Sequence, residues 1–339
     1  MKDTILEVKD LSVTFTQYDR GFSRRTLHAV EKMDLSVRAG EIVAVVGSSG
    51  SGKSLLAHAI MGILPYNSAM DGEIRFLGTP LTAERVKKLR GHEIVFVPQS
   101  VSYLDPLMKI GDQIRNGKKD HSVKEKCLAV LKRYGLAPDI REKYPFQLSG
   151  GMTRRVLIST AVMETPRLVI ADEPTKGLDA VIRNQVYSVL RQIYTEHHCS
   201  MLVITHDLAL ARRLCDDIRV LYMGRIIEQG TAEEIFAHPA HPYTIGLMAS
   251  KPVVGRQVDK LYSIPGKVPN PINMPNYCYF KDRCEMCVNG CEGDYPCEVS
   301  ISPTHKVSCY RYYDGKRPDL EEVVEEELAE GKENGKEGE

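Results

Sequence analysis

Eight residues from position 47 to position 54 have the types and the spacing of a loop that binds phosphate. They read Gly47-Ser48-Ser49-Gly50-Ser51-Gly52-Lys53-Ser54. In this pattern the glycines let backbone N–H groups turn toward phosphate oxygens. We expect the Lys53 ammonium to reach the β- and γ-phosphates of a nucleotide and the Ser54 hydroxyl to bind Mg²⁺. The segment therefore predicts a nucleoside triphosphate site, with ATP and Mg²⁺ as the ligands.

Two neighbouring carboxylates, Asp172 and Glu173, support this prediction. They end the hydrophobic run Leu168-Val-Ile-Ala. In an open α/β sheet, ligands bind at the carboxyl ends of the strands. We expect Asp172 to hold the Mg²⁺ shell and Glu173 to orient and polarise an attacking water molecule, as the catalytic base. A solvated strand end would explain such a pair standing alone, but not one that accompanies a phosphate loop.

The pattern along the chain predicts elements that place these residues at one edge of a sheet. Short β-branched runs alternate with helical patterns, which indicates an α/β core with a largely parallel sheet. The segment 5–35 instead predicts antiparallel strands, interrupted by a polar insertion at 17–26. We expect the parallel strands at 42–46, 94–97, 168–171, 201–205 and 218–221, and helices at 53–61, 150–163, 180–197 and after Asp207.

The bulk composition excludes some classes of function. Of 339 residues, 42% are hydrophobic and 27% are charged, and 45 Lys and Arg balance 45 Asp and Glu. This balance does not predict binding to nucleic acid, and we expect none. The apolar runs are far shorter than the roughly 20 residues that span a bilayer. Residues 1–11 lack the apolar core of a signal peptide, so we expect the chain in the cytoplasm.

Between the two phosphate-site elements lies Leu148-Ser149-Gly150-Gly151-Met152, which resembles the signature of ABC-family ATPases. Other landmarks of that family follow in its order. Gln99 resembles the Q-loop glutamine, Asp179 the D-loop aspartate and His206 the switch histidine. Phe15 is the best match to the aromatic residue that stacks on adenine, with Tyr18 and Phe22 as alternatives.

The resemblance implies a fold and a mechanism. The fold is a P-loop ATPase core with an antiparallel β subdomain and a helical signature subdomain. Two cassettes bind ATP between them, head to tail, so that Ser149, Gly150 and Gly151 meet a γ-phosphate held by the lysine of the partner. His206 would contact the γ-phosphate, and Gln99 would join the Mg²⁺ shell and report the nucleotide to a docked partner.

Beyond the cassette the resemblance narrows to the ATPases of oligopeptide and dipeptide importers. The carboxyl-terminal stretch His241-Pro-Tyr-Thr-Ile-Gly-Leu-Met-Ala-Ser-Lys-Pro252 and the segment 264–269 carry it. It implies a second ATPase subunit, usually a different chain, two membrane-spanning permeases and an external solute-binding protein, with this subunit on the cytoplasmic face of the membrane. Import of nickel, a metallophore or another small solute, and a non-transport ABC ATPase, are the alternatives.

Two motifs depart from the family pattern. The signature continues Met152-Thr-Arg154-Arg155, where a Gln commonly appears two or three places after the glycine pair. The D-loop reads Lys176-Gly-Leu-Asp179 instead of the more usual Thr-Ala-Leu-Asp. Neither departure removes a catalytic group.

The composition changes near residue 263, where spaced prolines begin. We therefore predict an ATPase domain at 1–262, a small Cys-rich carboxyl-terminal module at 263–318 and a disordered acidic tail at 319–339, whose last twenty residues hold nine Glu and two Lys.

Six of the nine cysteines lie between Cys278 and Cys309, which suggests a metal site. Cys278, Cys284, Cys291 and Cys309 fall where importer ATPases place four cysteines, and the resemblance implies a [4Fe–4S] cluster with a structural role. Four thiolates would equally suit zinc, and free or oxidised thiols are a further alternative. The remaining cysteines are extra to that pattern: Cys287 and Cys297 nearby, and Cys127, Cys199 and Cys215 in the cassette, where buried inert thiols are expected.

Overall fold

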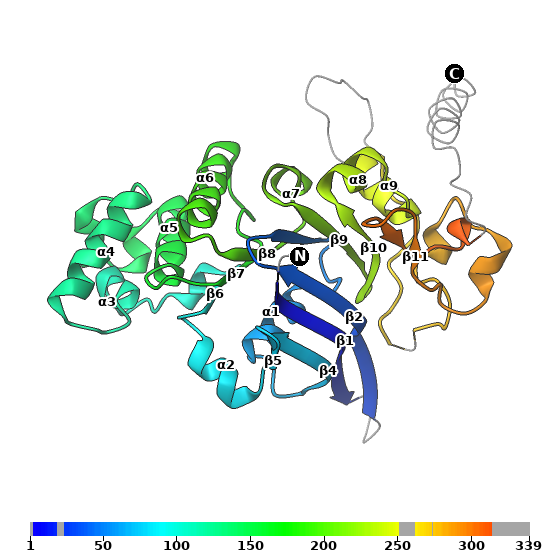
Figure 1. The fold of residues 1–339 in the computed structure, drawn as a ribbon, viewed down its shortest axis with the longest axis horizontal. Helices are drawn as coiled ribbons and strands as arrows, with labels where there is room; N and C mark the ends of the chain where they lie inside the picture. Colours follow the sequence, from blue (N-terminus) through cyan, green and yellow to red (C-terminus); the bar gives the residue numbers. More distant parts are fainter. Residues whose placement is uncertain (1–2, 19–23, 251–261, 273, 314–339) are drawn as a thin grey trace.

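The computed structural model describes residues 3–18, 24–250, 262–272 and 274–313. The predicted acidic tail and residue Phe22 lie outside these residues. Two sheets organise the molecule (Figure 1). No helix among the described residues is long and apolar enough to cross a membrane.

The larger sheet has eight strands, and its centre is parallel. Strands β6, β7, β8, β3 and β9 run parallel to one another, whereas β10, β12 and β11 continue the sheet in antiparallel fashion. The order is β11-β12-β10-β9-β3-β8-β7-β6. The bounds are β3 Ile42–Val46, β6 Ile94–Val97, β7 Leu168–Asp172, β8 Ser200–Thr205, β9 Asp217–Tyr222, β10 Arg225–Thr231, β11 Val299–Ser300 and β12 Lys306–Val307.

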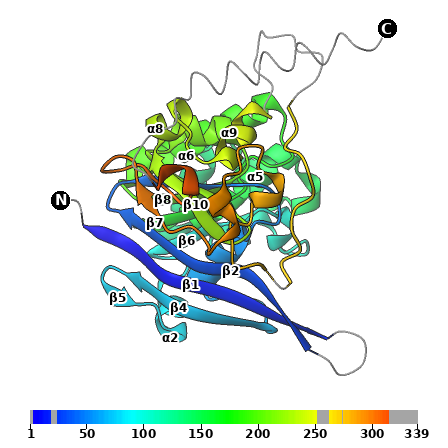
Figure 2. The same ribbon diagram turned by 90° about the vertical axis from the view of Figure 1, so that its right-hand side faces the viewer.

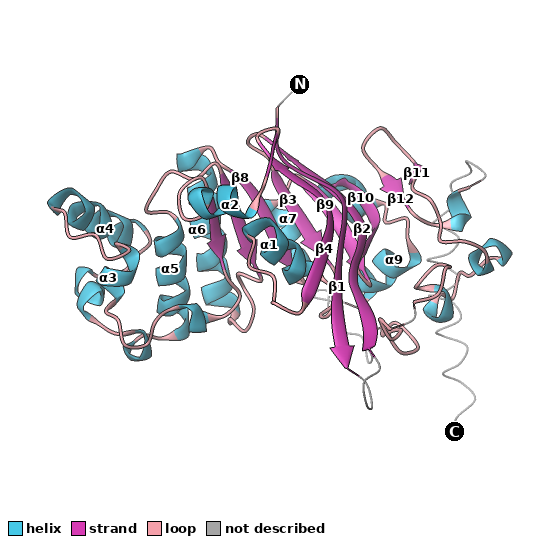
Figure 3. Cartoon of the chain, turned by 90° about the horizontal axis from the view of Figure 1, so that it is seen from below, coloured by secondary structure: helices cyan, strands magenta, loops and turns pink. Residues whose placement is uncertain are grey.

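The smaller sheet is antiparallel, with the order β2-β1-β4-β5. It crosses in front of the parallel strands when the molecule is seen from below (Figure 3). The sequence predicts the long hairpin of β1 and β2, whereas β4 and β5 were not expected. The bounds are β1 Thr4–Tyr18, β2 Arg24–Arg38, β4 Ser68–Phe76 and β5 Thr79–Pro80.

Helices pack on the larger sheet, and some of them lie beyond it at one end. Helices α3, α4 and α5 form a helical group at one end of the long axis, and the carboxyl-terminal segment lies at the opposite end (Figures 1 and 3). The bounds are α1 Lys53–Met61, α2 Ala83–Leu89, α3 Ile110–Ile114, α4 His121–Arg133, α5 Gly150–Ala161, α6 Ala180–His197, α7 Leu208–Leu214, α8 Ala232–Ala237 and α9 Pro242–Ala249.

The central strands are buried on both faces, which explains why their sequences are continuous apolar runs. Every residue of β3, β7 and β8 is buried. The sequence predicts β3, β6, α1 and α6 at their observed bounds, and it places the other parallel strands within one residue at each end.

The carboxyl-terminal segment, predicted as a separate module from residue 263, joins the same sheet. Strand β12 pairs with β10, and β11 pairs with β12. Tyr279 and Phe280 belong to the same buried apolar cluster as Tyr222 of β9. The boundary predicted at 262/263 lies one residue after 251–261, which are outside the described part, so the domain limits remain predictions. Figure 2 shows the segment beside β10 and α9.

Candidate functional site

The phosphate loop links the end of β3 to the start of α1, as the sequence predicts. Gly52 caps the helix with φ 97°. A Cβ at this position would come within 2.6 Å of the Ala29 carbonyl oxygen on β2, and a Cβ at Gly47 within 2.2 Å of the Leu221 carbonyl oxygen on β9. Since no side chain fits in either place, glycine is required for the loop to lie between the two sheets.

Lys53 is buried in this loop. Its ammonium donates hydrogen bonds to the carbonyl oxygens of Gly47 at 2.9 Å and Ser48 at 2.7 Å. It also lies 3.9 Å from Glu173 Oε1. Burial lowers the pKa of Lys53, while the carboxylates of Glu173 and Asp172 act in the opposite direction. The loop thus concentrates one cation next to two carboxylates.

Asp172 ends β7 beside the first turn of α1. Burial raises the pKa of its carboxyl group, and a hydrogen bond with the Ser54 hydroxyl acts against this shift. Its Oδ1 atom is buried and has no hydrogen-bond partner among the described residues. A buried acceptor oxygen next to a serine hydroxyl fits the oxygen ligands that Mg²⁺ prefers.

Glu173 and His206 meet at the carboxyl ends of neighbouring parallel strands, β7 and β8. Glu173 Oε2 lies 2.7 Å from His206 Nδ1. The Glu173 side chain is buried, whereas His206 is about half exposed. The backbone of Glu173 has φ 46°, a left-handed conformation that non-glycine residues rarely adopt and that is concentrated at functional sites. A hydrogen bond from the Glu173 N–H to the Ile204 carbonyl oxygen at 2.7 Å holds it there.

Arg154 connects two of the predicted site residues and was not recognised as functional from the sequence. This buried side chain of α5 donates hydrogen bonds to the carbonyl oxygens of Pro98 at 2.6 Å, Gln99 at 2.9 Å and Glu173 at 3.2 Å. The departure from the family pattern at 152–155 was the only signal. Since one guanidinium holds both backbones, it fixes the Gln99 loop relative to Glu173.

The other predicted nucleotide contacts begin helices and face outward. Ser149 caps α5 by accepting from the Met152 N–H at 3.4 Å. Asp179 caps α6 by accepting from the N–H groups of Val181 and Ile182 at 2.9 and 3.0 Å. Ser149, Gly150 and Asp179 are exposed, whereas Gly151 packs against Ile182. These exposed helix starts are available to another chain.

Phe15 lies on β1, where it pairs with Leu27 of β2. It is partly buried and packs against the core between the two sheets. Its partner strand reaches the phosphate loop two residues further on, at Ala29. The predicted role of Phe15 in stacking on adenine stays a prediction. Of the two alternatives, Phe22 lies outside the described residues, as does the side chain of Tyr18.

The four cysteines predicted as ligands lie near one another. Cys278 and Cys284 are half-buried, and Cys291 and Cys309 are buried. Burial raises the pKa of Cys278 to about 11 and the pKa of Cys284 and of Cys309 to about 12, and neighbouring thiols of the same group add to each shift. Across the described part of the chain, no group of three or more His, Cys, Asp or Glu side chains could hold a metal ion.

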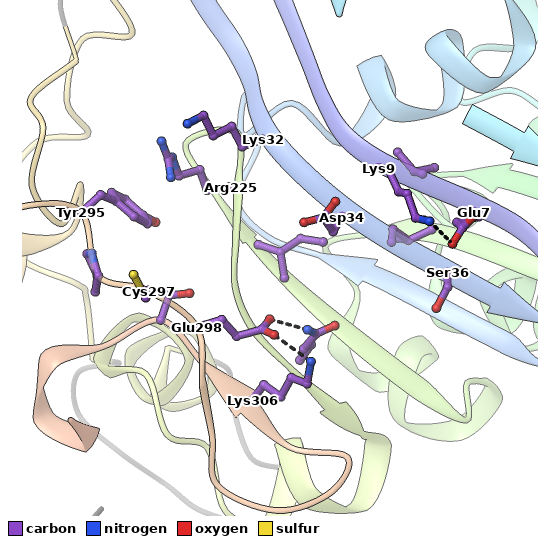
Figure 4. A pocket seen from close by; sticks show the side chains of 16 residues that line it. Glu7, Lys9, Lys32, Asp34, Ser36, Arg225, Tyr295, Cys297, Glu298 and Lys306 are labelled. Carbon is purple, nitrogen blue, oxygen red and sulfur yellow. Dashed lines mark hydrogen bonds and ion pairs between the residues drawn. The ribbon is translucent and has the colours of Figure 1, made fainter. Parts of the chain in front are cut away.

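The two extra cysteines of this segment, Cys287 and Cys297, are exposed. Cys297 lines a hollow of about 550 Å³ between β1, β2, β10 and the carboxyl-terminal segment (Figure 4). Two ion pairs lie within its lining, Lys306 with Glu298 and Lys9 with Glu7, each at 2.9 Å. No residue of the phosphate loop lines it. The cassette cysteines, Cys127, Cys199 and Cys215, are buried and their pKa is raised by burial.

Comparisons with known proteins show which proteins the chain resembles. A family model described as ABC transporter matches residues 30–176, and one described as Oligopeptide/dipeptide transporter, C-terminal region, matches residues 227–291. A solved structure of the ATP-binding cassette MJ0796, a dimeric post-hydrolysis state bound to ADP and Pi, is similar with a TM-score of 0.58 and 27% identity, covering 67% of this chain and 99% of that chain.

Curated relatives match almost the whole chain. The oligopeptide transport ATP-binding protein AppD of Bacillus subtilis is 36% identical over 324 residues, which cover 91% of this chain and 97% of that protein. The oligopeptide transport ATP-binding protein OppD of Escherichia coli is 35% identical over 321 residues, 91% of this chain and 94% of that protein. With identity at this level over nearly the full length of both chains, this chain belongs to the family of ATP-binding subunits of oligopeptide/dipeptide ABC transporters.

Proposed function

We propose that this subunit hydrolyses ATP at the edge of the sheet where the phosphate loop, Asp172, Glu173 and His206 meet, and that hydrolysis drives the import of dipeptides or oligopeptides. One observation carries the proposal. The Glu173 carboxylate lies between the Lys53 ammonium, at 3.9 Å, and the His206 imidazole, at 2.7 Å, at the ends of neighbouring parallel strands.

In this arrangement Glu173 accepts a proton from the attacking water molecule, and His206 orients the carboxylate. Lys53 leaves the carbonyl oxygens of its own loop to pair with the β- and γ-phosphates. Asp172 and Ser54 would hold Mg²⁺, with Gln99 as a further ligand, and the ion would supply positive charge against the phosphate oxygens. Arg154 holds the backbones of Gln99 and Glu173 in a fixed position relative to each other.

The partners are a second ATPase subunit, two permeases and an external solute-binding protein, and the subunit works on the cytoplasmic face of the membrane. A surface next to the Gln99 loop supports the docking of a permease. Directly after Gln99 the chain exposes four large apolar side chains. A group of exposed apolar side chains is typical of a surface that another protein covers. They are Val101, Tyr103, Leu107 and Met108, with exposed fractions of 46%, 56%, 85% and 41%.

The test uses Glu173→Gln in the whole importer, reconstituted in proteoliposomes with its partners. Because the amide cannot accept the proton, ATP hydrolysis falls by at least ~10²-fold, while Mg-ATP still binds. Uptake of labelled dipeptide falls with it. The matched control, Glu233→Gln on the exposed surface of α8, keeps both rates. Hydrolysis by Glu173→Gln at the wild-type rate would rule out this base, and uptake of Ni²⁺ in place of peptide would identify a different solute.

We propose further that Cys278, Cys284, Cys291 and Cys309 bind one [4Fe–4S] cluster. The proximity and burial of these thiols support it, because four thiolates are the ligands that such a cluster takes. The cluster would crosslink a segment that has few apolar residues of its own.

Iron and sulfide analysis of anaerobically purified protein tests the cluster. We expect near four iron and four sulfide per chain, brown protein, and loss of both on Cys284→Ser. Cys297→Ser is the control and keeps the iron, because Cys297 faces the separate hollow of Figure 4. Colourless protein with one zinc would replace the cluster by a zinc site. Loss of iron on changing Cys287 alone would show that the ligand set is different.

A further inference from the structure

The phosphate loop has a hydrogen-bond partner far away in the sequence. The backbone N–H of Ser48 donates to the hydroxyl oxygen of Tyr243 at 2.9 Å, across 195 residues. Tyr243 lies in the first turn of α9 and is 1% exposed. A buried hydroxyl that reaches a loop N–H removes the cost of leaving that N–H unpaired.

Ser48 is held through its carbonyl oxygen as well as through its N–H group. Its carbonyl oxygen accepts from the Lys53 ammonium at 2.7 Å and from the Ser51 hydroxyl at 2.9 Å. Lys53 gives up this acceptor when it pairs with the phosphates of ATP. The Tyr243 hydroxyl has no such competing role, so together with the Ser51 hydroxyl it keeps the loop in place while Lys53 changes partners.

Tyr243 is itself fixed from behind. Its ring packs on Tyr222 of β9 with centroids 4.6 Å apart and on Phe280 of the carboxyl-terminal segment at 5.6 Å. Arg283 of that segment donates to the Tyr222 hydroxyl at 3.2 Å. The ring therefore cannot withdraw from the loop without disturbing the packing of the carboxyl-terminal segment.

The start of α9 is fixed as well. Burial lowers the pKa of His241 to about 3, so its imidazole is neutral at physiological pH. Neutral Nδ1 accepts a hydrogen bond from the Tyr243 N–H at 3.0 Å. The backbone and the ring of Tyr243 are thus both held, which leaves the hydroxyl at a constant place beside the loop.

We propose that Tyr243 is a positioning residue for the phosphate loop, and that the carboxyl-terminal segment acts on ATP binding through it. This inference rests on the proposed ATPase function. It gives the carboxyl-terminal segment a role at the nucleotide site, from which the sequence had separated it. Since the loop holds the phosphates of substrate and transition state alike, the effect falls on nucleotide affinity and KM more than on kcat.

The test compares Tyr243→Phe with Tyr194→Phe in the full-length chain assembled with its partners. Each change removes one tyrosine hydroxyl and keeps the ring, but the hydroxyl of Tyr194, on α6, donates to the Gly40 carbonyl oxygen at 3.2 Å and has no part in holding Tyr243. We expect Tyr243→Phe to raise the Kd for ATP and the KM by about tenfold, with kcat within about twofold. Tyr194→Phe leaves all three within about twofold.

Hydrogen exchange of the peptide that contains Ser48 provides a second measurement. Exchange at this amide becomes faster in Tyr243→Phe and stays at the wild-type rate in Tyr194→Phe. Phe280→Leu, in the carboxyl-terminal segment, raises KM in the same direction as Tyr243→Phe. Equal KM values and equal exchange for the two tyrosine variants overturn the inference. A wild-type protein without ATP hydrolysis contradicts the proposed function instead.

Discussion

Arg154 shows how one side chain unites parts of the site that are far apart in the sequence. Its guanidinium is buried and donates hydrogen bonds to the carbonyl oxygens of Pro98, Gln99 and Glu173. Burial lowers the pKa of this arginine, and the nearby carboxylates of Asp172 and Glu173 act against the shift. The guanidinium charge is thus shielded from water and lies close to the two carboxylates. Its N–H groups hold the Gln99 loop and the Glu173 loop together.

Removing this guanidinium separates the two loops. Arg154→Ala leaves three buried carbonyl oxygens without their donor, so we expect the free energy of unfolding to fall by about 3 kcal/mol. We also expect kcat for ATP hydrolysis to fall by about tenfold, because Gln99 and Glu173 lose their common support. Chemical denaturation and steady-state hydrolysis measure the two effects.

Arg155→Ala is the matched control. The neighbouring arginine donates to the carbonyl oxygen of Gly135 at 2.9 Å, on the side of α5 away from the nucleotide site. It therefore affects stability without a comparable loss of kcat. A wild-type kcat in folded Arg154→Ala would show that Arg154 has no part in arranging the site.

At the level of single residues, the sequence predicts those site residues that end a strand or open a helix. Asp172 and Glu173 were placed because they follow a continuous apolar run, and His206 was placed by its resemblance to the switch histidine at the end of a strand. Arg154 and Tyr243 could not be placed in this way, since their function depends on contacts with residues 55 and 195 positions away. Helical periodicity marks both simply as buried.

At the level of elements, the buried carboxylate of Glu228 connects β10, the start of α9 and the segment before β12. Glu228 of β10 accepts from the N–H groups of Ala240 at 2.7 Å and His241 at 2.8 Å, before α9. Its Oε1 also lies 2.8 Å from His305 Nε2, before β12. Glu228 and His305 are both about 1% exposed. The carboxylate thus fixes α9 and the carboxyl-terminal segment to the sheet.

Glu228→Gln tests this junction, because the glutamine side chain has nearly the same shape as the glutamate side chain. An amide has one acceptor oxygen instead of two, so a buried N–H group loses its partner and we expect the free energy of unfolding to fall by about 2–3 kcal/mol. The control is Glu298→Gln, which breaks the exposed pair with Lys306 and costs less than about 1 kcal/mol. Equal losses of unfolding free energy in urea denaturation would mean that the buried junction stabilises the fold no more than the exposed ion pair does.

Length explains which elements the sequence predicts. The parallel strands and α6 carry enough periodic residues to be recognised. Strands β11 and β12 have two residues each and lie among prolines and cysteines, so no periodicity can mark them. They exist because β10 offers an edge to pair with, which is a tertiary cause.

At the scale of the whole molecule, the signature helix and the phosphate loop face different surroundings. Helix α5 belongs to the helical group at one end of the molecule, whereas α1 lies behind the antiparallel sheet (Figure 3). Ser149 is exposed at the start of α5. This arrangement suits a head-to-tail pair in which each nucleotide is held by the loop of one chain and the signature of the other.

Ser149→Arg tests that arrangement. The bulky cation at the helix start blocks the γ-phosphate bound to the lysine of the partner, so we expect hydrolysis at that site to be lost. ATP affinity at Lys53 of the same chain stays within about twofold, as measured by titration of the isolated subunit. Ser188→Arg, on the exposed side of α6, leaves hydrolysis unchanged. Collapse of ATP binding at Lys53 would contradict the head-to-tail pair.

The pairing of β12 with β10 also bears on how the protein behaves in solution. Without β12, the backbone N–H and C=O groups of Glu228 and Gln229 would form an open sheet edge. Open edges recruit strands from neighbouring copies and promote aggregation. A cassette cut at residue 262 would therefore tend to self-associate, and the carboxyl-terminal segment protects the colloidal stability of the ATPase as well as its fold.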